Sequence, residues 1–516
     1  MARVLHGALV TIEQASSVAA GGVGPATSGL NIPFSMNVVP DFKRFDFLFP
    51  GLQADPENLL PVKPQTVANL QRLGQTMLDS NPRDEMNSAV PAGYTYLGQF
   101  VDHDITFEVT SGDLASIHDP NLAPLSLDDI RNNIRNTRSA TLDLDSVYEG
   151  LAPRVGEKML IGKNSALNGT SKPALRPVGK DLDNDLPRRP RSVDPAFDRE
   201  ALIGDPRNDE NTIVSQLHTA FLRAHNNIVD LGNDFTSARR LLRQHYQWMI
   251  IHDFLTRIAD LNIVERVLYA NSVFRPENDN FFMPLEFTAA AYRFGHTMIR
   301  ADYDFNLNFN TSGSPGTLPA TLGLLFTFTA LTGQLGDNDT LPDNWIIEWE
   351  NFVETGGVFN FARRFDTKLV EPLFTLRDFE GQPLPDEARL AVRNLLRGYL
   401  LRIPTGQSVA GELGITPLTS IEIIAAATSD DQAAALTETG FDIKTPLWYY
   451  ILAESAHYGG NQLGPVGSTI IAEVLIGLIR RSEDSILADN SFAPTLGSTA
   501  GEFRLPDLLR LAGVLN

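Results

Sequence analysis

Apolar side chains recur every three or four positions over long stretches of this chain. In the clearest case one helix face carries Ile213, Leu217, Phe221 and Ile228, and Gly232 predicts the end of the helix. The same pattern predicts helices within residues 238–270, 387–401, 420–436 and 467–480. We find no meander of alternating apolar and polar residues and no internal repeat, so the pattern predicts a mainly α fold with long loops.

Segments rich in Gly, Pro and small residues lie between these runs. Residues 1–40 have this composition, which predicts an N-terminal arm or loop region. Within a proline-rich stretch at 172–195, the basic cluster Pro187–Arg191 is expected to be a solvated surface loop. The apolar run Thr469–Ile479 contains Glu473 and is too short to cross a bilayer, so we expect a buried helix and no membrane span.

Composition narrows the classes of partner and ligand. The 516 residues are 43% hydrophobic, which suffices for a large core, and carry a net charge of −21. Such a surface repels phosphate backbones, so nucleic acid is not an expected partner. The chain has no cysteine, and a bound iron would need His, Tyr or Met as its axial ligand.

The N-terminus, with Arg3 as its one charge and His6 interrupting its apolar run, is a poor secretory signal. Localisation therefore stays open between secretion or the cell surface by a route without a classical signal peptide and the cytoplasm. The sequence does not predict the oligomeric state.

The strongest chemical signal is the segment Gly98–Phe107, in which Asp102 and Asp104 flank His103. On a helix Gln99 shares the face of His103, and the two carboxylates point about 100° to either side. An isolated histidine in such a setting is more often a satisfied core residue, so its meaning depends on partners elsewhere.

Three later segments supply such partners, each with two polar residues three positions apart. They contain Arg207 with Glu210, Arg293 with His296, and Asn394 with Arg397. In this order and at these separations the four segments resemble the heme peroxidase–cyclooxygenase superfamily, which includes myeloperoxidase, lactoperoxidase, peroxinectins and bacterial relatives. The resemblance implies one large heme-peroxidase domain over 41–516, with many helices, long loops and little β-structure.

The resemblance assigns one group of residues to the proximal side of a heme.

 It names His296 as the proximal ligand and Asn394 as the acceptor of a hydrogen bond from the other imidazole nitrogen. A neutral amide there leaves the imidazole less electron-rich than a carboxylate would, which favours a high reduction potential. Arg397 matches the residue that holds a heme propionate, and Arg293 belongs to the same cofactor-binding motif as His296.

On the distal side, the resemblance implies that His103 moves a proton between the two oxygens of hydrogen peroxide. Arg207 would stabilise the charge that develops as the O–O bond breaks, and Gln99 would orient peroxide, water or a halide. The implied function is a peroxidase that responds to oxidative stress and oxidises halide, pseudohalide or small aromatic donors through an oxoferryl intermediate. The physiological donor and the halide selectivity stay open.

Two further features follow from the resemblance. Asp102 and Glu210 match the carboxylates that form ester links to a heme b-derived cofactor, whereas Asn211 stands where myeloperoxidase has a methionine and cannot form a sulfonium link. A loop rich in oxygen donors implies a Ca²⁺ site. Its expected ligands are Asp104, Ser139, Thr141, Asp143 and Asp145.

Two alternatives remain. Fatty-acid dioxygenases of the same superfamily carry a radical-forming tyrosine three residues before the proximal histidine, where this chain has Arg293, with Tyr292 one residue earlier. A non-catalytic heme-binding adhesion protein is the second alternative. We find no Arg-Gly-Asp tripeptide, and both His103 and Arg207 are present.

Overall fold

The computed structural model describes most of the chain from residue 43 onward. The described residues are 10–11, 43–82, 86–110, 119, 121–139, 141–150, 152–165, 183–194, 197–270, 273–274, 282–311, 316–326, 329, 335, 338–375, 389–488 and 492–516. The predicted arm at 1–40 lies outside them, except for Val10–Thr11, which form strand β1.

Helices dominate the described residues, as the hydrophobic pattern predicts. The α-helices are α2 (Pro64–Gln75), α3 (Gly93–Ile105), α4 (Leu127–Asn133), α5 (Asp145–Tyr148), α6 (Thr212–Asp230), α7 (Phe235–Met249), α8 (Leu255–Ile258), α9 (Leu261–Tyr269), α10 (Leu285–Thr288), α11 (Leu322–Leu325), α12 (Glu371–Phe374), α13 (Leu390–Leu400), α14 (Gly406–Glu412), α15 (Ser420–Ala425), α16 (Asp430–Thr439), α17 (Leu447–His457), α18 (Pro465–Arg481) and α19 (Leu505–Leu511). Two 3₁₀ helices matter for the site, η4 (Pro206–Asp209) and η6 (Ala291–Met298).

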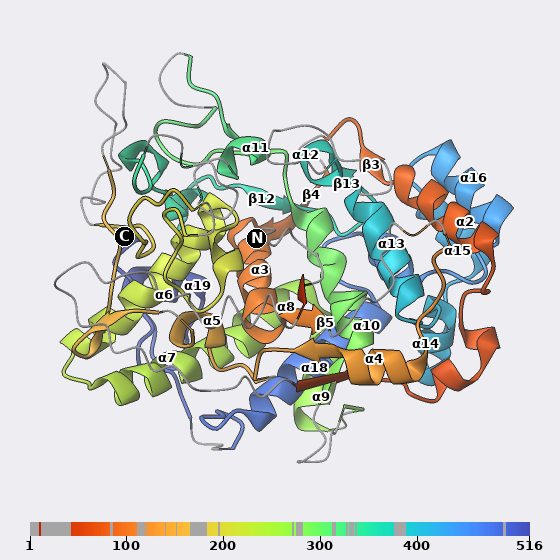
Figure 1. The fold of residues 1–516 in the computed structure, drawn as a ribbon, viewed down its shortest axis with the longest axis horizontal. Helices are drawn as coiled ribbons and strands as arrows, with labels where there is room; N and C mark the ends of the chain where they lie inside the picture. Colours follow the sequence, from red (N-terminus) through yellow and green to blue (C-terminus); the bar gives the residue numbers. More distant parts are fainter. Residues whose placement is uncertain are drawn as a thin grey trace.

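Helix α3 lies near the centre of the molecule (Figure 1). On one side of it α6 packs against α3, α7 and α19, and on the other side α13 packs against α2 and α17. One continuous hydrophobic core extends from Phe45 to Leu515. The fold is therefore a mainly α single domain built around the helix that carries His103.

The strands form small sheets. They are β1 (Val10–Thr11), β2 (Lys43–Asp46), β3 (Leu78–Asp79), β4 (Asn87–Pro91), β5 (Glu108–Thr110), β6 (Ile134–Asn136), β7 (Arg154–Val155), β8 (Lys158–Met159), β9 (Phe282–Pro284), β10 (Asp302–Tyr303), β11 (Ala320–Thr321), β12 (Phe361–Arg363) and β13 (Leu369–Val370). The largest sheet has the order β1-β5-β6-β2-β9. Strand β5 follows α3 and β9 leads through α10 into η6, so this sheet joins the two segments that carry His103 and His296.

The helix boundaries differ from the hydrophobic pattern in two places. The run 238–270 is divided by a π-helical turn at Ile250–Phe254 and by a new start at Asp260, whose carboxylate accepts from two backbone N–H groups of α9. The run 420–436 is divided into α15 and α16, because the Ser429 side chain caps the start of α16. Helices α6 and α18 confirm their predictions, and α18 is buried along most of its length.

The prediction of a solvated basic loop at Pro187–Arg191 is wrong for Arg188. Its guanidinium is buried and binds Asp209 through both Nη atoms, at 2.7 and 2.9 Å, and Asp185 through Nε at 2.8 Å. Two buried carboxylates supply the charge that burial of an arginine requires. None of the described helices is long and apolar enough to cross a membrane.

Candidate active site

The His103 side chain is buried on α3 and held from one side. Its Nδ1 lies 2.9 Å from Oδ1 of Asn208, while Nε2 is buried with no hydrogen-bond partner among the described residues. Burial, and secondarily the charge of Arg207, lower the pKa of His103 to about 4. The imidazole is therefore neutral at pH 7, with one nitrogen anchored and the other available.

Arg207 lies next to His103 and belongs to η4. This short 3₁₀ helix begins at Pro206, and the Asp205 side chain caps its N-terminus. Its Nε and Nη2 donate to the Asp205 carboxylate at 3.0 and 2.7 Å, and Nη2 also donates to the carbonyl oxygen of His103 at 3.1 Å. These bonds tie the guanidinium to the end of α3.

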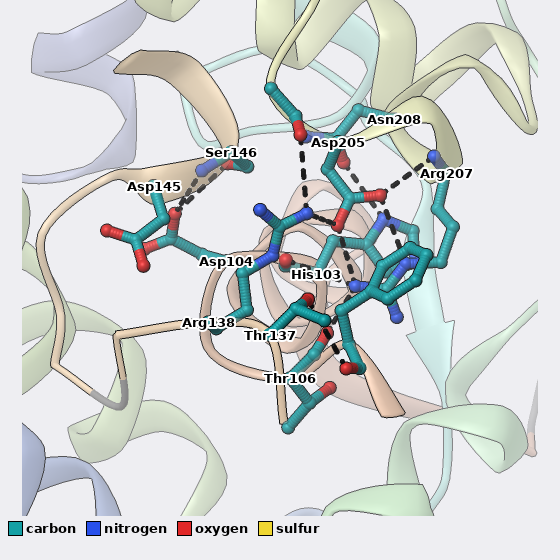
Figure 2. A network of polar contacts seen from close by, with 12 residues as sticks. His103, Asp104, Thr106, Thr137, Arg138, Asp145, Ser146, Asp205, Arg207 and Asn208 are labelled. Carbon is teal, nitrogen blue, oxygen red and sulfur yellow. Dashed lines mark hydrogen bonds and ion pairs between the residues drawn. The ribbon is translucent and has the colours of Figure 1, made fainter. Parts of the chain in front are cut away.

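Asp205 binds a second buried guanidinium, that of Arg138 (Figure 2). Burial of the Asp205 carboxyl opposes its ionisation, but Arg207 and Arg138 outweigh this effect and hold the pKa well below its usual range. Asp205 therefore remains a carboxylate that orients Arg207 and crosslinks the η4 turn to the segment after β6.

The Gln99 amide on α3 contacts two residues that lie between η4 and α6. Asn211 Nδ2 donates to Gln99 Oε1 at 3.0 Å, and Gln99 Nε2 donates to Glu210 Oε2 at 3.5 Å. The Asp102 carboxylate accepts from the Thr106 hydroxyl at 3.2 Å. The structure thus brings Gln99 and Glu210 together, and it places Asp102 on the same helix one residue before His103.

His296, the predicted proximal ligand, lies on η6 and contacts Asn394 of α13, with 3.0 Å between His296 Nδ1 and Asn394 Nδ2. Arg293 donates from Nη1 to Asn394 Oδ1 at 3.0 Å. The expected pair is present, but the amide turns its nitrogen toward His296 because Arg293 binds its oxygen. Ligation of a metal through Nε2 puts the imidazole proton on Nδ1, so it would require the Asn394 amide to rotate.

The Arg397 guanidinium, expected at a heme propionate, binds the carboxylate of Glu108 on β5. Both side chains are largely buried: 6% of the Arg397 side chain and 19% of the Glu108 side chain is exposed. The carboxylate that Arg397 binds in the structure is thus that of a protein side chain, and its role toward a heme propionate stays a prediction. Glu108 itself was not among the predicted site residues.

The groups around His103 and His296 lie on elements that pack against each other. Helix α3 packs against η6, and the Tyr292 hydroxyl of η6 donates to the carbonyl oxygen of Gly98, next to Gln99, at 3.1 Å. Burial lowers the pKa of Arg293 and the nearby charge of Asp102 opposes this shift. Residues almost 200 positions apart in the sequence thus form one site around the α3–η6 contact.

The oxygen-rich loop joins this site from the other face of α3. The Asp104 carboxylate accepts from the backbone N–H groups of Leu144 and Ser146 at 3.2 and 3.0 Å, and Asp145 accepts from that of Ser139 at 2.8 Å. Burial and the charge of Asp145 raise the pKa of Asp104 to about 8.

The other predicted calcium ligands of this loop are Ser139, Thr141 and Asp143. The hydroxyl groups of Ser139 and Thr141 lie 2.6 Å apart, and Asp143 Oδ1 is buried with no hydrogen-bond partner in the part of the chain that the structure describes. No group of three or more His, Asp or Glu side chains in the described residues is arranged to hold a metal ion. The structure therefore brings Asp104 and Asp145 together, and the charge of Asp143 acts on Asp145.

Sequence reasoning missed several residues that complete the site, namely Asn208, Asp205, Arg138 and Glu108. Asp205 had a local signal, because an Asp directly before Pro206 is a typical helix start. His218, on α6, contacts Asn208 Nδ2 through its Nδ1 at 2.9 Å. The other residues carried no signal, since their partners are remote in the sequence.

Comparison with known proteins identifies the class. The model of the animal haem peroxidase family matches residues 126–474, more than half of the chain, so the chain belongs to this family. The matched range includes His296 and Asn394 but begins after His103. No curated protein sequence matches the chain.

Solved structures share the fold at low sequence identity. Peroxidase A from Dictyostelium discoideum is 15% identical, with a TM-score of 0.55 over 89% of this chain and 90% of that protein. The fatty acid α-dioxygenase of Oryza sativa is 15% identical, with a TM-score of 0.54 over 88% and 78%. That of Arabidopsis thaliana is 13% identical, with a TM-score of 0.50 over 88% and 74%.

Proposed function

We propose that this chain is a heme peroxidase that reduces hydrogen peroxide and oxidises a halide, a pseudohalide or a small aromatic donor. The observation that carries the proposal is a buried neutral His103 with a free Nε2, beside a fixed Arg207 and across the α3–η6 contact from His296. Each turnover takes two electrons from the donor and releases water. Removal of peroxide in this way would serve the response to oxidative stress.

The residues divide the chemistry between them. Heme bound at His296 would supply the iron at which peroxide is reduced. His103 Nε2 would take a proton from one peroxide oxygen and return it to the other, which its unprotonated state permits. Arg207 would stabilise the negative charge that develops between the oxygens, and Asp205 holds it in position.

The direct test is an optical spectrum of the heme-loaded protein with and without peroxide, followed by assays with iodide, bromide and a phenol. We expect a change in the spectrum on adding peroxide and its return to the resting form when a donor is added. A protein that binds heme but turns over none of these donors would instead be the non-catalytic member considered above.

A fatty-acid dioxygenase is the second candidate, because α-dioxygenases share the fold and Tyr292 is buried on η6 beside the distal helix. Against it, the position three residues before His296 is Arg293, which is bound to Asn394. Oxygen uptake on adding a polyunsaturated fatty acid without peroxide would favour the dioxygenase, and its absence the peroxidase.

We also infer a Ca²⁺ site at the loop around Asp104 and Asp145, with Ser139, Thr141 and Asp143 as the other ligands. The charges support it. Burial and neighbouring carboxylates raise the pKa of Asp104 and of Asp145, and the guanidinium of Arg138, which Asp205 also binds, offsets this only in part. A divalent cation would stabilise the charged form of both carboxylates. Arg138 lies between Asp205 and the loop carboxylates (Figure 2).

Replacing Asp143 by Ala is expected to release this calcium and, through Asp104 next to His103, to change the heme spectrum and lower thermal stability. Elemental analysis of protein purified without chelator measures the metal, and Asp431→Ala on the exposed start of α16 is the control. Fully active wild-type protein that contains no calcium would remove the site from the proposal.

Ester links from Asp102 and Glu210 to heme methyl groups are a further expected property. Each link replaces a methyl C–H bond by a C–O bond, and hydrogen peroxide accepts the two electrons and leaves as water. We expect peroxide-treated protein to retain heme in acidified solvent, with peptides containing Asp102 and Glu210 carrying the added mass. Asn211 has no sulfur and forms no link.

The two links are expected to form separately. Glu210→Gln should lose one of them and retain the other, whereas Glu200→Gln, at a partly buried carboxylate paired with Arg189, should retain both. Quantitative release of free heme after peroxide turnover would show that neither carboxylate forms an ester.

A further inference from the structure

Asn208 connects two buried histidines through one side-chain amide. Its Oδ1 lies 2.9 Å from His103 Nδ1 and its Nδ2 lies 2.9 Å from His218 Nδ1. All three side chains are fully buried, and the Nε2 atoms of both histidines have no partner among the described residues. The amide is thus the anchor that the structure provides for the His103 ring.

An amide in this position determines which nitrogen of each ring carries the proton. The oxygen accepts, so His103 carries its proton on Nδ1 and leaves a lone pair on Nε2. The amide nitrogen donates, so His218 has its lone pair on Nδ1 and its proton on Nε2. The two histidines are therefore held in opposite tautomers by the same group.

Asn208 is itself held rigidly. It lies on η4 between Arg207, bound to Asp205, and Asp209, bound through both carboxylate oxygens to the buried Arg188. His218 lies on α6, which packs against α3. The amide therefore has little freedom to rotate or to follow a moving imidazole.

We propose that Asn208 is a positioning residue that holds His103 in the tautomer with a free Nε2 lone pair, and that His218 fixes the direction of the Asn208 amide. The inference rests on the proposed function, because that lone pair matters only if His103 takes a proton from a ligand. It goes beyond the motif residues, since the four motif segments give no role to Asn208 or His218.

The first test reads the tautomers directly in the full-length, heme-loaded protein in its diamagnetic ferrous carbon monoxide form. Selective ¹⁵N labelling of the nine histidines, with His103→Gln and His218→Gln to assign the signals, should show His103 protonated at Nδ1 and His218 at Nε2. His103 protonated at Nε2 would overturn the proposal by itself.

The second test uses Asn208→Leu and Asn208→Asp. Leucine removes both hydrogen bonds, and we expect cyanide, which must lose a proton to a distal base, to bind the ferric protein at least about tenfold more slowly. Aspartate accepts from both rings, so it should keep His103 protonated at Nδ1, restore most of the cyanide association rate and move the His218 proton to Nδ1.

A matched control is Asn226→Leu on α6, which loses two hydrogen bonds to the backbone of Met159, at 2.7 and 2.8 Å, remote from His103. It should leave cyanide association unchanged. An Asn208→Leu protein that binds cyanide as fast as wild type would overturn the proposal, and if this variant does not fold, the wild-type tautomers and Asn208→Asp decide. Correct tautomers in a protein that does not turn over peroxide would instead refute the proposed function alone.

Discussion

Replacing His296 by Ala is expected to abolish stable heme binding. The chain has no cysteine, and among its histidines His296 carries the proximal motif and contacts Asn394. In protein not treated with peroxide, in which no ester links have formed, loss of the axial bond removes the main attachment of the heme. We therefore expect heme to be lost on gel filtration and its absorption to disappear from the protein fraction. Added imidazole, which can occupy the space of the missing ring, should restore part of the absorption.

The control for this prediction is His252→Ala, which removes an exposed histidine that stacks on Trp248. That variant should retain heme. A His296→Ala protein with a five-coordinate heme and near-normal activity would show that another residue is the axial ligand.

Replacing His103 or Arg207 by Ala is expected to leave heme bound and to slow the reaction with peroxide by orders of magnitude. General acid–base catalysis of this kind contributes roughly 10²- to 10⁴-fold, and one preorganised electrostatic group contributes on the order of 10²- to 10³-fold. Stopped-flow mixing of the heme-loaded variants with peroxide measures the rate.

The two variants should differ in stability. Arg207→Ala leaves the buried Asp205 carboxylate with Arg138 as its remaining guanidinium partner, so its thermal midpoint should fall further than that of His103→Ala. Arg72→Ala, at an exposed ion pair with Glu438, should change neither the rate nor the midpoint. Unchanged peroxide rates in both distal variants would refute their assignment.

The hydrophobic pattern predicts where most of the observed helices lie, because amphipathic periodicity reflects burial of one face and needs no knowledge of partners. It does not predict where α15 ends and α16 begins, since the cap at Ser429 interrupts a run that stays apolar on both sides. The composition of Pro187–Arg191 misplaces Arg188 in solvent, because a basic cluster between prolines gives no sign of the two carboxylates that bind it.

For the site, the sequence by itself determined the residue types and their local spacing on each segment, including His103 beside Asp102 and Arg293 before His296. The tertiary structure decided which groups meet across the chain: Asn208 with both His103 and His218, Asp205 with Arg138, and Arg397 with Glu108. The reason is physical, because a buried polar group must find a partner in space, and that partner depends on how α3, η4 and α13 pack rather than on neighbouring residues.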